Sequence, residues 1–298
     1  MTALGAHRST AIGIDVGGTT VKGLLVDAEG AVVLEHRAPT PSPDPTGEGV
    51  VDVITRLVDH LGGTESLQTG VVVPGVVDEG RGTAVLSTNI GWKDVPLHAM
   101  LERRLGRGIS FGHDVRAGAL AEARWGAAAD RSDTVVFVPI GTGIAAALLS
   151  DSRPLVSGGW AGEIGQLVIG HGPFAGLRVE EVASAEGTAR RAHLPSARDV
   201  ADRVLEGDPA AVVVWNDTIT VLADALVTLT AVVGPEMIVI GGGLALSGHV
   251  LLDPLERAFS DRLGPALRRP VLVQAQLGDR AAALGAALLA FRAAGATV

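Results

Sequence analysis

The sequence IDVGGTTVKGLLVD, at residues 14–27, determines the fold that we expect for this chain. An apolar strand runs into a Gly-Gly-Thr-Thr turn, and a second apolar strand follows and ends on an acidic residue. This pattern occurs twice. At one constant offset Gly17 falls on Gly141, and the same offset places Asp27 on Asp151. A duplicated unit of this kind predicts two related domains that face each other across a cleft, where ligands bind.

Strands alternate with helices along the rest of the chain. The spacing of Val50, Ile54 and Leu57 indicates a helix with one buried face. Apolar strands are predicted at residues 69–75, 134–139 and 144–150. Helices are predicted at residues 117–125 and 218–233, with a closing helix at residues 280–294, and residues 39–49 are predicted to form a loop. This alternation is typical of an α/β architecture.

Composition and charge exclude several classes of protein. The 298 residues include 47% hydrophobic and 19% charged residues, as in a folded globular protein. The formal net charge is −9 and Lys and Arg do not cluster, so we predict no nucleic-acid partner. No apolar run reaches the roughly 20 residues that cross a bilayer, and residues 1–10 lack the apolar segment of a signal peptide. We therefore predict a cytoplasmic protein with no membrane partner. The lack of cysteine excludes disulfides and thiolate metal sites.

Three glycine loops follow apolar strands and are candidates for nucleotide binding. Glycines let the backbone approach a phosphate closely and turn N–H groups toward it, and threonine hydroxyls add donors. Any one loop could be a simple tight turn, but two repeat-related loops and a third favour phosphate binding. Asp15 could also hold a hydrated Mg²⁺. The candidates are Asp15, Gly17, Gly18, Thr19, Thr20, Gly141, Thr142, Gly143, Gly241, Gly242 and Gly243. The chain has neither a Walker A pattern nor a GxGxxG fingerprint.

Motifs along nearly the whole chain resemble those of the ROK family of sugar kinases and repressors. They are IDVGGTTVKGLLVD, VPGVVD at residues 73–78, STNIGWKDVPL at 87–97, GHDVRAGALAEARWGAA at 112–128, GGWAGEIGQ at 158–166 and VIGGGL at 239–244. The resemblance implies a two-domain, actin-like (ribonuclease H-like) ATPase fold with an interdomain cleft. It also implies a first domain that consists of residues 1–113 together with about 280–298, and a second domain of residues 114–279. A further implication is a homodimer.

The resemblance also implies roles for individual residues. Asp114 matches the catalytic base, although an aspartate at this position is also a good helix N-cap. Asn89, Glu163 and Glu180 match sugar ligands. Plain turn roles are the alternative for Asn89 and Glu163, and neighbouring Glu181 is an alternative equivalent of Glu180.

The chain departs from the family pattern in three places, and the departures at His113 and Gln166 concern the sugar more than the reaction. Gln166 replaces a zinc-binding histidine and residues 171–179 lack the family's cysteines, so we predict no structural zinc. His113 replaces the asparagine that precedes the catalytic aspartate, and Thr20 stands where many members carry lysine. His113 and Gln166 both fall at positions expected to line the sugar.

The resulting prediction is an ATP- and Mg²⁺-dependent kinase for a small sugar, with glucose at its 6-hydroxyl as the first candidate. The alternatives are a kinase for an N-acetylhexosamine or fructose, a polyphosphate-dependent glucokinase, and a sugar-binding regulatory protein with weak catalysis. A repressor is disfavoured, because the first strand begins near Ala11 and leaves no room for a preceding DNA-binding segment.

Overall fold

The computed structural model describes residues 9–64, 67–129, 131 and 133–296. The chain forms two compact units. Unit 1 holds the chain up to Ala121, Val156–Trp160 and the chain from Arg280 onward; unit 2 holds Glu122–Leu155 and Ala161–Asp279. The segment in which we predicted no signal peptide lies, up to residue 8, outside the described residues.

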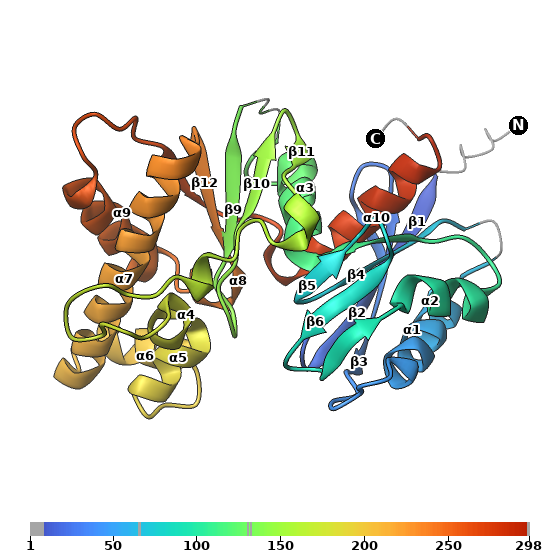
Figure 1. Cartoon of the computed structure of the whole chain (residues 1–298), viewed down its shortest axis with the longest axis horizontal. Helices are drawn as coiled ribbons and strands as arrows, with labels where there is room; N and C mark the ends of the chain where they lie inside the picture. Colours follow the sequence, from blue (N-terminus) through green and yellow to red (C-terminus); the bar gives the residue numbers. More distant parts are fainter. Residues whose placement is uncertain (1–8, 65–66, 130, 132, 297–298) are drawn as a thin grey trace, which may run out of the picture. The chain divides into compact units, whose positions relative to one another are not determined.

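Unit 1 is built on a five-stranded sheet in the order β3-β2-β1-β4-β8 (Figure 1). Its strands are β1 (Thr10–Val16), β2 (Thr20–Asp27), β3 (Val32–Pro39), β4 (Thr69–Val73) and β8 (Ser110–His113). Strands β1, β2 and β3 pair antiparallel, whereas β4 pairs parallel with both β1 and β8. Helices α1 (Glu48–His60) and α2 (Leu97–Leu105) share a buried apolar cluster with one face of this sheet.

Helix α10 (Ala281–Ala293) packs directly on β1 and β4, with its backbone close to the backbones of the two strands. A Cβ atom added at Gly13 would lie 1.9 Å from the carbonyl oxygen of Ala283, and one at Gly70 1.9 Å from that of Ala286. Two strands and a helix can therefore approach this closely because the strands carry glycine there. Helix α3 (Asp114–Trp125) follows β8, and its Ala117 belongs to the apolar cluster of Ala286.

A second sheet in unit 1 was not predicted from the sequence. It consists of β5 (Val76–Asp78), β6 (Thr83–Ser87) and β7 (Trp92–Val95), in antiparallel pairs. Trp92 is buried in the core of the unit. The strands have three to five residues each, which is too short for a clear alternating pattern.

Unit 2 repeats the sheet of unit 1, which confirms the duplication predicted from the sequence. The order β11-β10-β9-β12-β13 has the same arrangement of antiparallel and parallel pairs. The strands are β9 (Val135–Pro139), β10 (Ala147–Ser150), β11 (Arg153–Pro154), β12 (Met237–Gly241) and β13 (Val271–Gln274). Strand β10 begins later than the predicted start at Ile144, which forms only an isolated bridge to Ile140.

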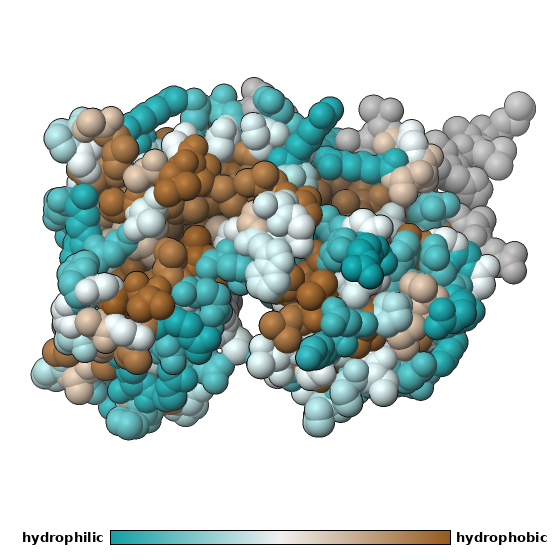
Figure 2. Space-filling view, viewed as in Figure 1, coloured by the Kyte–Doolittle hydropathy of each residue, from teal (hydrophilic) through white to brown (hydrophobic). Residues whose placement is uncertain are grey.

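Helices cover the sheet of unit 2. They are α4 (Val179–Ala183), α5 (Ala185–Arg191), α6 (Ala197–Leu205), α7 (Pro209–Val233), α8 (Gly242–Ala245) and α9 (His249–Arg262). Short 3-10 turns lie at Ser157–Gly159 in unit 1, at Ile164–Gln166 in unit 2, and at Gly278–Arg280 where the chain passes between the units. The hydropathy view shows apolar residues gathered on the drawn face of unit 2 near α7 and β12 (Figure 2).

Helix α7 is longer than the sequence predicted. We expected it to start at Thr218, but it starts at Pro209, because the Asp208 carboxylate caps the N–H groups of Ala210 and Ala211. Within the described part of the chain, α7 alone is long and apolar enough to cross a membrane, contrary to our expectation of no such run. Half of its most apolar window is buried, and it packs against α9, α4 and α6, as a core helix does.

Candidate active site

Asp114 lies where β8 ends and α3 begins. Its Oδ1 atom accepts a hydrogen bond from the backbone N–H of Val115 at 2.7 Å and lies 3.2 Å from Nε2 of His113. The side chain is 24% exposed, so a substrate hydroxyl can reach it. A helix N-terminus favours negative charge at this position. The carboxylate is thus oriented and accessible, which are two conditions for a general base.

His113 is buried beside Asp114. The side chain of His113 is 6% exposed, and its Nδ1 accepts a hydrogen bond from the backbone N–H of Arg116 at 3.4 Å. Burial and the positive charge of Arg116 lower the pKa of His113 to about 3, against an opposing hydrogen bond to the backbone of Gly75. The imidazole is therefore neutral at physiological pH.

Arg116 and Glu79 form an ion pair next to His113 that sequence analysis missed. Arg116 Nε donates to Glu79 Oε1 at 2.9 Å, and the same oxygen accepts the backbone N–H of His113 at 3.1 Å. The guanidinium also donates to the carbonyl of Val77, while its buried NH1 has no hydrogen-bond partner within the described part of the chain. The available sequence signal was a charged residue in the first turn of an otherwise alanine-rich helix.

Asn89 lies beside the first glycine loop. A Cβ atom added at Gly18 would lie 3.7 Å from Cβ of Asn89. The two segments are held together by residues 40–44, which sequence analysis treated only as a loop. Thr40 Oγ1 donates to the carbonyl of Gly17 at 2.7 Å, and Ser42 Oγ donates to that of Asn89 at 2.7 Å. The structure therefore brings a predicted sugar ligand and a predicted phosphate loop together.

Asp15 is the last polar residue of β1 before the glycine loop. It stands opposite Lys22 in the β1–β2 ladder. One carboxylate with phosphate oxygens and water is a usual environment for Mg²⁺ bound to a nucleotide. Among the described residues no group of three His, Cys, Asp or Glu side chains could hold a metal ion. Asp15 therefore fits Mg²⁺ that arrives with a nucleotide, and Thr19 and Thr20 complete this loop.

The second and third glycine loops lie side by side in unit 2. The N–H of Ile140, which precedes the loop of Gly141, Thr142 and Gly143, donates to the carbonyl of Gly241 at 2.9 Å. Gly242 has φ of 76°, and a Cβ atom there would lie 2.5 Å from the backbone nitrogen of Ile140. The conformation of Gly242 is thus a requirement of the fold. Gly243, in contrast, has open space around its Cα atom.

Gln166 and Glu180 contact each other directly. Gln166 Nε2 donates to Glu180 Oε1 at 2.8 Å, and Arg178 NH1 donates to Gln166 Oε1 at 3.1 Å. A Cβ atom at Gly143 would lie 3.1 Å from Glu180 Oε2, which places this carboxylate at the second glycine loop. Glu163 stands directly before the 3-10 turn that carries Gln166. Three of the predicted sugar ligands therefore belong to one region of unit 2.

Glu181 has a different role from Glu180. Its carboxylate accepts the backbone N–H of Arg178 at 2.8 Å and so caps the start of α4. This hydrogen bond, together with the Arg178 side chain, lowers the pKa of Glu181. The geometry favours Glu180 over Glu181 as the residue that faces the glycine loop.

Comparison with known proteins decides the family. A sequence profile of the ROK family matches residues 11–293. The chain belongs to the ROK family. It is 29% identical to a glucokinase of Streptomyces coelicolor over 94% of this chain and 96% of that protein. It is 30% identical to an N-acetylmannosamine kinase of Escherichia fergusonii over 94% of this chain and 98% of that one.

A solved structure is similar to the whole fold. It is a ROK family glucokinase from Streptomyces griseus in complex with glucose and AMPPNP. The TM-score is 0.84 at 27% sequence identity, and the match covers 95% of this chain and 99% of that one. This likeness confirms the predicted α/β fold of the actin-like type.

In this ROK chain, backbone hydrogen bonds close the segment where the family pattern has cysteines. The N–H of Val179 donates to the carbonyl of Leu167 at 2.9 Å, and that of Ile169 donates to Leu177 at 2.8 Å. The guanidinium of Arg191 stacks over the ring of Phe174, 4.6 Å from its centroid. Backbone hydrogen bonds and one aromatic side chain therefore hold this segment in place.

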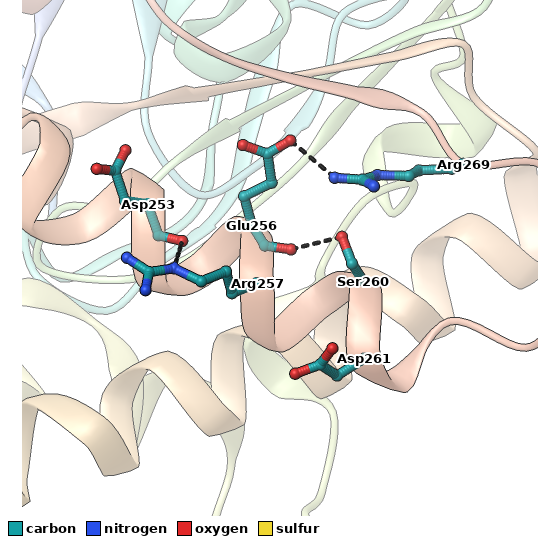
Figure 3. A pocket seen from close by; sticks show the side chains of 6 residues that line it. All are labelled: Asp253, Glu256, Arg257, Ser260, Asp261 and Arg269. Atoms are coloured by element: carbon teal, nitrogen blue, oxygen red, sulfur yellow. Dashed lines mark hydrogen bonds and ion pairs between the residues drawn. The ribbon is translucent and has the colours of Figure 1, made fainter.

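A surface pocket on α9 contains none of the predicted site residues (Figure 3). Its lining alternates in charge, and Arg269 pairs with Glu256 at 2.9 Å. The pocket thus holds both signs of charge and none of the predicted site residues, so its concave shape gives no functional assignment.

Proposed function

We propose that this chain transfers the γ-phosphoryl group of ATP to a hexose, with the 6-hydroxyl of glucose as the first candidate acceptor. The observation that carries the proposal is the Asp114 carboxylate, which is partly exposed, fixed at the start of α3 and in contact with a neutral imidazole. The match to the ROK family over residues 11–293 supports a sugar as the acceptor.

In the proposed reaction Asp114 takes the proton of the attacking sugar hydroxyl. A neutral hydroxyl is a poor nucleophile, and a carboxylate within hydrogen-bond reach removes its proton as the new P–O bond forms. General-base catalysis of this kind typically contributes about 10²–10⁴-fold to the rate. The remaining acceleration in phosphoryl transfer comes from positioning and from charge neutralisation.

The other site residues bind and orient the two substrates. Carboxylates and amides are suitable partners for sugar hydroxyls, and we assign this role to Asn89, Glu163, Gln166 and Glu180. The glycine loops around Gly17, Gly141 and Gly243 would offer backbone N–H groups to the phosphates and the nucleoside. Mg²⁺ would neutralise phosphate charge, and Asp15 would hold it through water.

A coupled assay of ADP release tests the proposal. Purified protein is given ATP and Mg²⁺ with glucose, mannose, fructose, N-acetylglucosamine or N-acetylmannosamine, together with an Asp114→Asn variant. We expect one sugar to drive ADP release and the variant to lose at least about 100-fold in kcat. Asp253→Asn on α9 is a matched control that should keep full activity. Asp114→Asn activity within about threefold of wild type would refute the role of Asp114.

The second candidate is a sugar-binding regulatory protein with little catalysis. It is favoured by the departures at His113 and Gln166, which alter the family pattern where the sugar is expected. This candidate predicts that no sugar gives turnover with ATP or with polyphosphate, while one sugar still raises the melting temperature. Turnover with polyphosphate alone would instead assign the alternative donor.

A further inference from the structure

We infer that His113 is a positioning residue that orients the Asp114 carboxylate from its buried side, and that it does not bind the sugar. The inference rests on the proposed function for its catalytic consequence. It corrects the role suggested by the family pattern, in which this position lines the sugar.

The hydrogen bonds define which ring nitrogen carries the proton. Nδ1 of His113 accepts the backbone N–H of Arg116, so it carries no hydrogen in the neutral ring. The single ring proton is therefore on Nε2. This atom lies 3.2 Å from Oδ1 of Asp114. The hydrogen bond to the backbone of Gly75 raises the pKa of the ring, so the ring donates it, and the same Nε2 proton has to serve it. The ring thus shares its one N–H between the backbone of Gly75 and the catalytic carboxylate.

The charges around the ring keep it neutral. The groups that face it are Asp114, Arg116 of the same helix turn, and Glu79 from the segment after β5. Arg116 is paired with Glu79, which also accepts the backbone N–H of His113. A protonated His113 would be a second cation buried next to the guanidinium of Arg116, which is unfavourable. As a neutral donor, the ring orients the Asp114 carboxylate without adding a positive charge that would make the carboxylate a weaker base.

Burial excludes direct contact between most of the ring and a ligand. The side chain of His113 is 6% exposed, compared with 24% for Asp114. The two ring nitrogens are both engaged by protein atoms, so neither is available to a sugar hydroxyl. A contribution of His113 to the reaction therefore has to act through Asp114.

Two substitutions of similar size separate positioning from sugar binding. His113→Gln keeps an N–H donor near the place of Nε2, whereas His113→Leu keeps the volume and removes the donor. We expect His113→Leu to lower kcat about 10- to 100-fold, because a small misplacement of a catalytic group has effects of this size. The KM for the sugar should stay within about twofold, and His113→Gln should keep kcat within about threefold. A sugar ligand would show the reverse, with KM raised more than about tenfold and kcat retained, and that result would overturn the inference.

Nuclear magnetic resonance of the histidine ring nitrogens gives a readout that needs neither activity nor a substitution. We expect the His113 ring of the wild-type protein to be protonated only on Nε2 from pH 8 down to about pH 5. A proton on Nδ1, or a titration near pH 6.5, would disprove the inference even if both variants fail to fold. Absence of any sugar-dependent turnover in the wild type would refute the proposed function and leave this measurement valid.

Discussion

Gly141→Ala tests whether the second glycine loop holds phosphate. A Cβ atom at Gly141 would meet no heavy atom of the described residues within 4 Å, and the φ of Gly141 lies outside the left-handed region. Nothing in the fold therefore requires glycine at this position. If the loop binds a nucleotide, the open space beside Gly141 is where a phosphate would approach the backbone.

The expected magnitudes follow from this geometry. Because alanine fits without strain and restricts the unfolded chain, the free energy of unfolding should rise by about 0.4–1 kcal/mol. A methyl group in the path of a phosphate would weaken one or two charge-assisted hydrogen bonds, each worth about 1.5–3 kcal/mol. We therefore expect the KM for ATP to rise at least about tenfold, since 1.4 kcal/mol corresponds to a factor of ten.

The assay measures KM for ATP at saturating sugar, together with the melting temperature. Gly264→Ala is the matched control, because Gly264 also has open space and lies outside the predicted loops. It should leave the KM for ATP unchanged. Gly242→Ala should instead destabilise the fold, since Gly242 has φ of 76° and close backbone neighbours. If Gly141→Ala and Gly264→Ala both leave the KM for ATP within about twofold, the loop does not hold phosphate.

Three other predictions concern buried or networked side chains. Glu122→Gln should lower the free energy of unfolding by about 2 kcal/mol in urea titrations, because three backbone N–H groups donate to the Glu122 carboxylate and at least one of them would face an amide N–H₂. A loss below about 1 kcal/mol would contradict this. Arg178→Ala should raise the KM for the sugar about two- to fivefold with kcat unchanged, because Gln166 and Glu180 lose an exposed partner that orients them. Arg178→Lys should recover part of this loss, and an unchanged KM would count against the network. The pKa of His113 falls from its ordinary value of 6.5 to about 3, so the unfolded chain takes up this proton at a higher pH than the native chain. The free energy of unfolding should therefore fall by up to about 1.4 kcal/mol per pH unit as the pH drops from about 6 to 4, and His113→Gln should remove this component. Parallel pH profiles of the wild type and His113→Gln would contradict the prediction.

The sequence predicted the parts of the fold that repeat. The offset between Gly17 and Gly141 anticipated two sheets of the same strand order, because the duplication conserves strand, turn and strand. The break between β8 and α3 at Asp114 follows from the change of pattern there, although the helix starts three residues before the predicted Ala117. Local sequence was therefore sufficient to predict features that depend on a single strand, turn or helix.

Contacts between distant segments were not predictable from sequence. The ion pair joins Arg116 of α3 to Glu79, which lies 37 positions earlier in the segment after β5, and nothing local marks Glu79 as its partner. The burial of His113 likewise depends on its position in β8 of the folded sheet. The hydrogen bonds of residues 40–44 to two predicted site loops arise only when the chain folds back on itself.

The packing of α10 has a consequence for synthesis of the chain on the ribosome. Domains generally fold in the order in which they are made, starting from the N-terminus. In this chain, β1 and β4 are translated before the helix that covers Gly13 and Gly70. The nascent chain therefore carries a sheet with one bare apolar face until α10 has been made. A fragment that stops before Arg280 would keep that face uncovered, so a nonsense mutation just before Arg280 should be as damaging as one before β4.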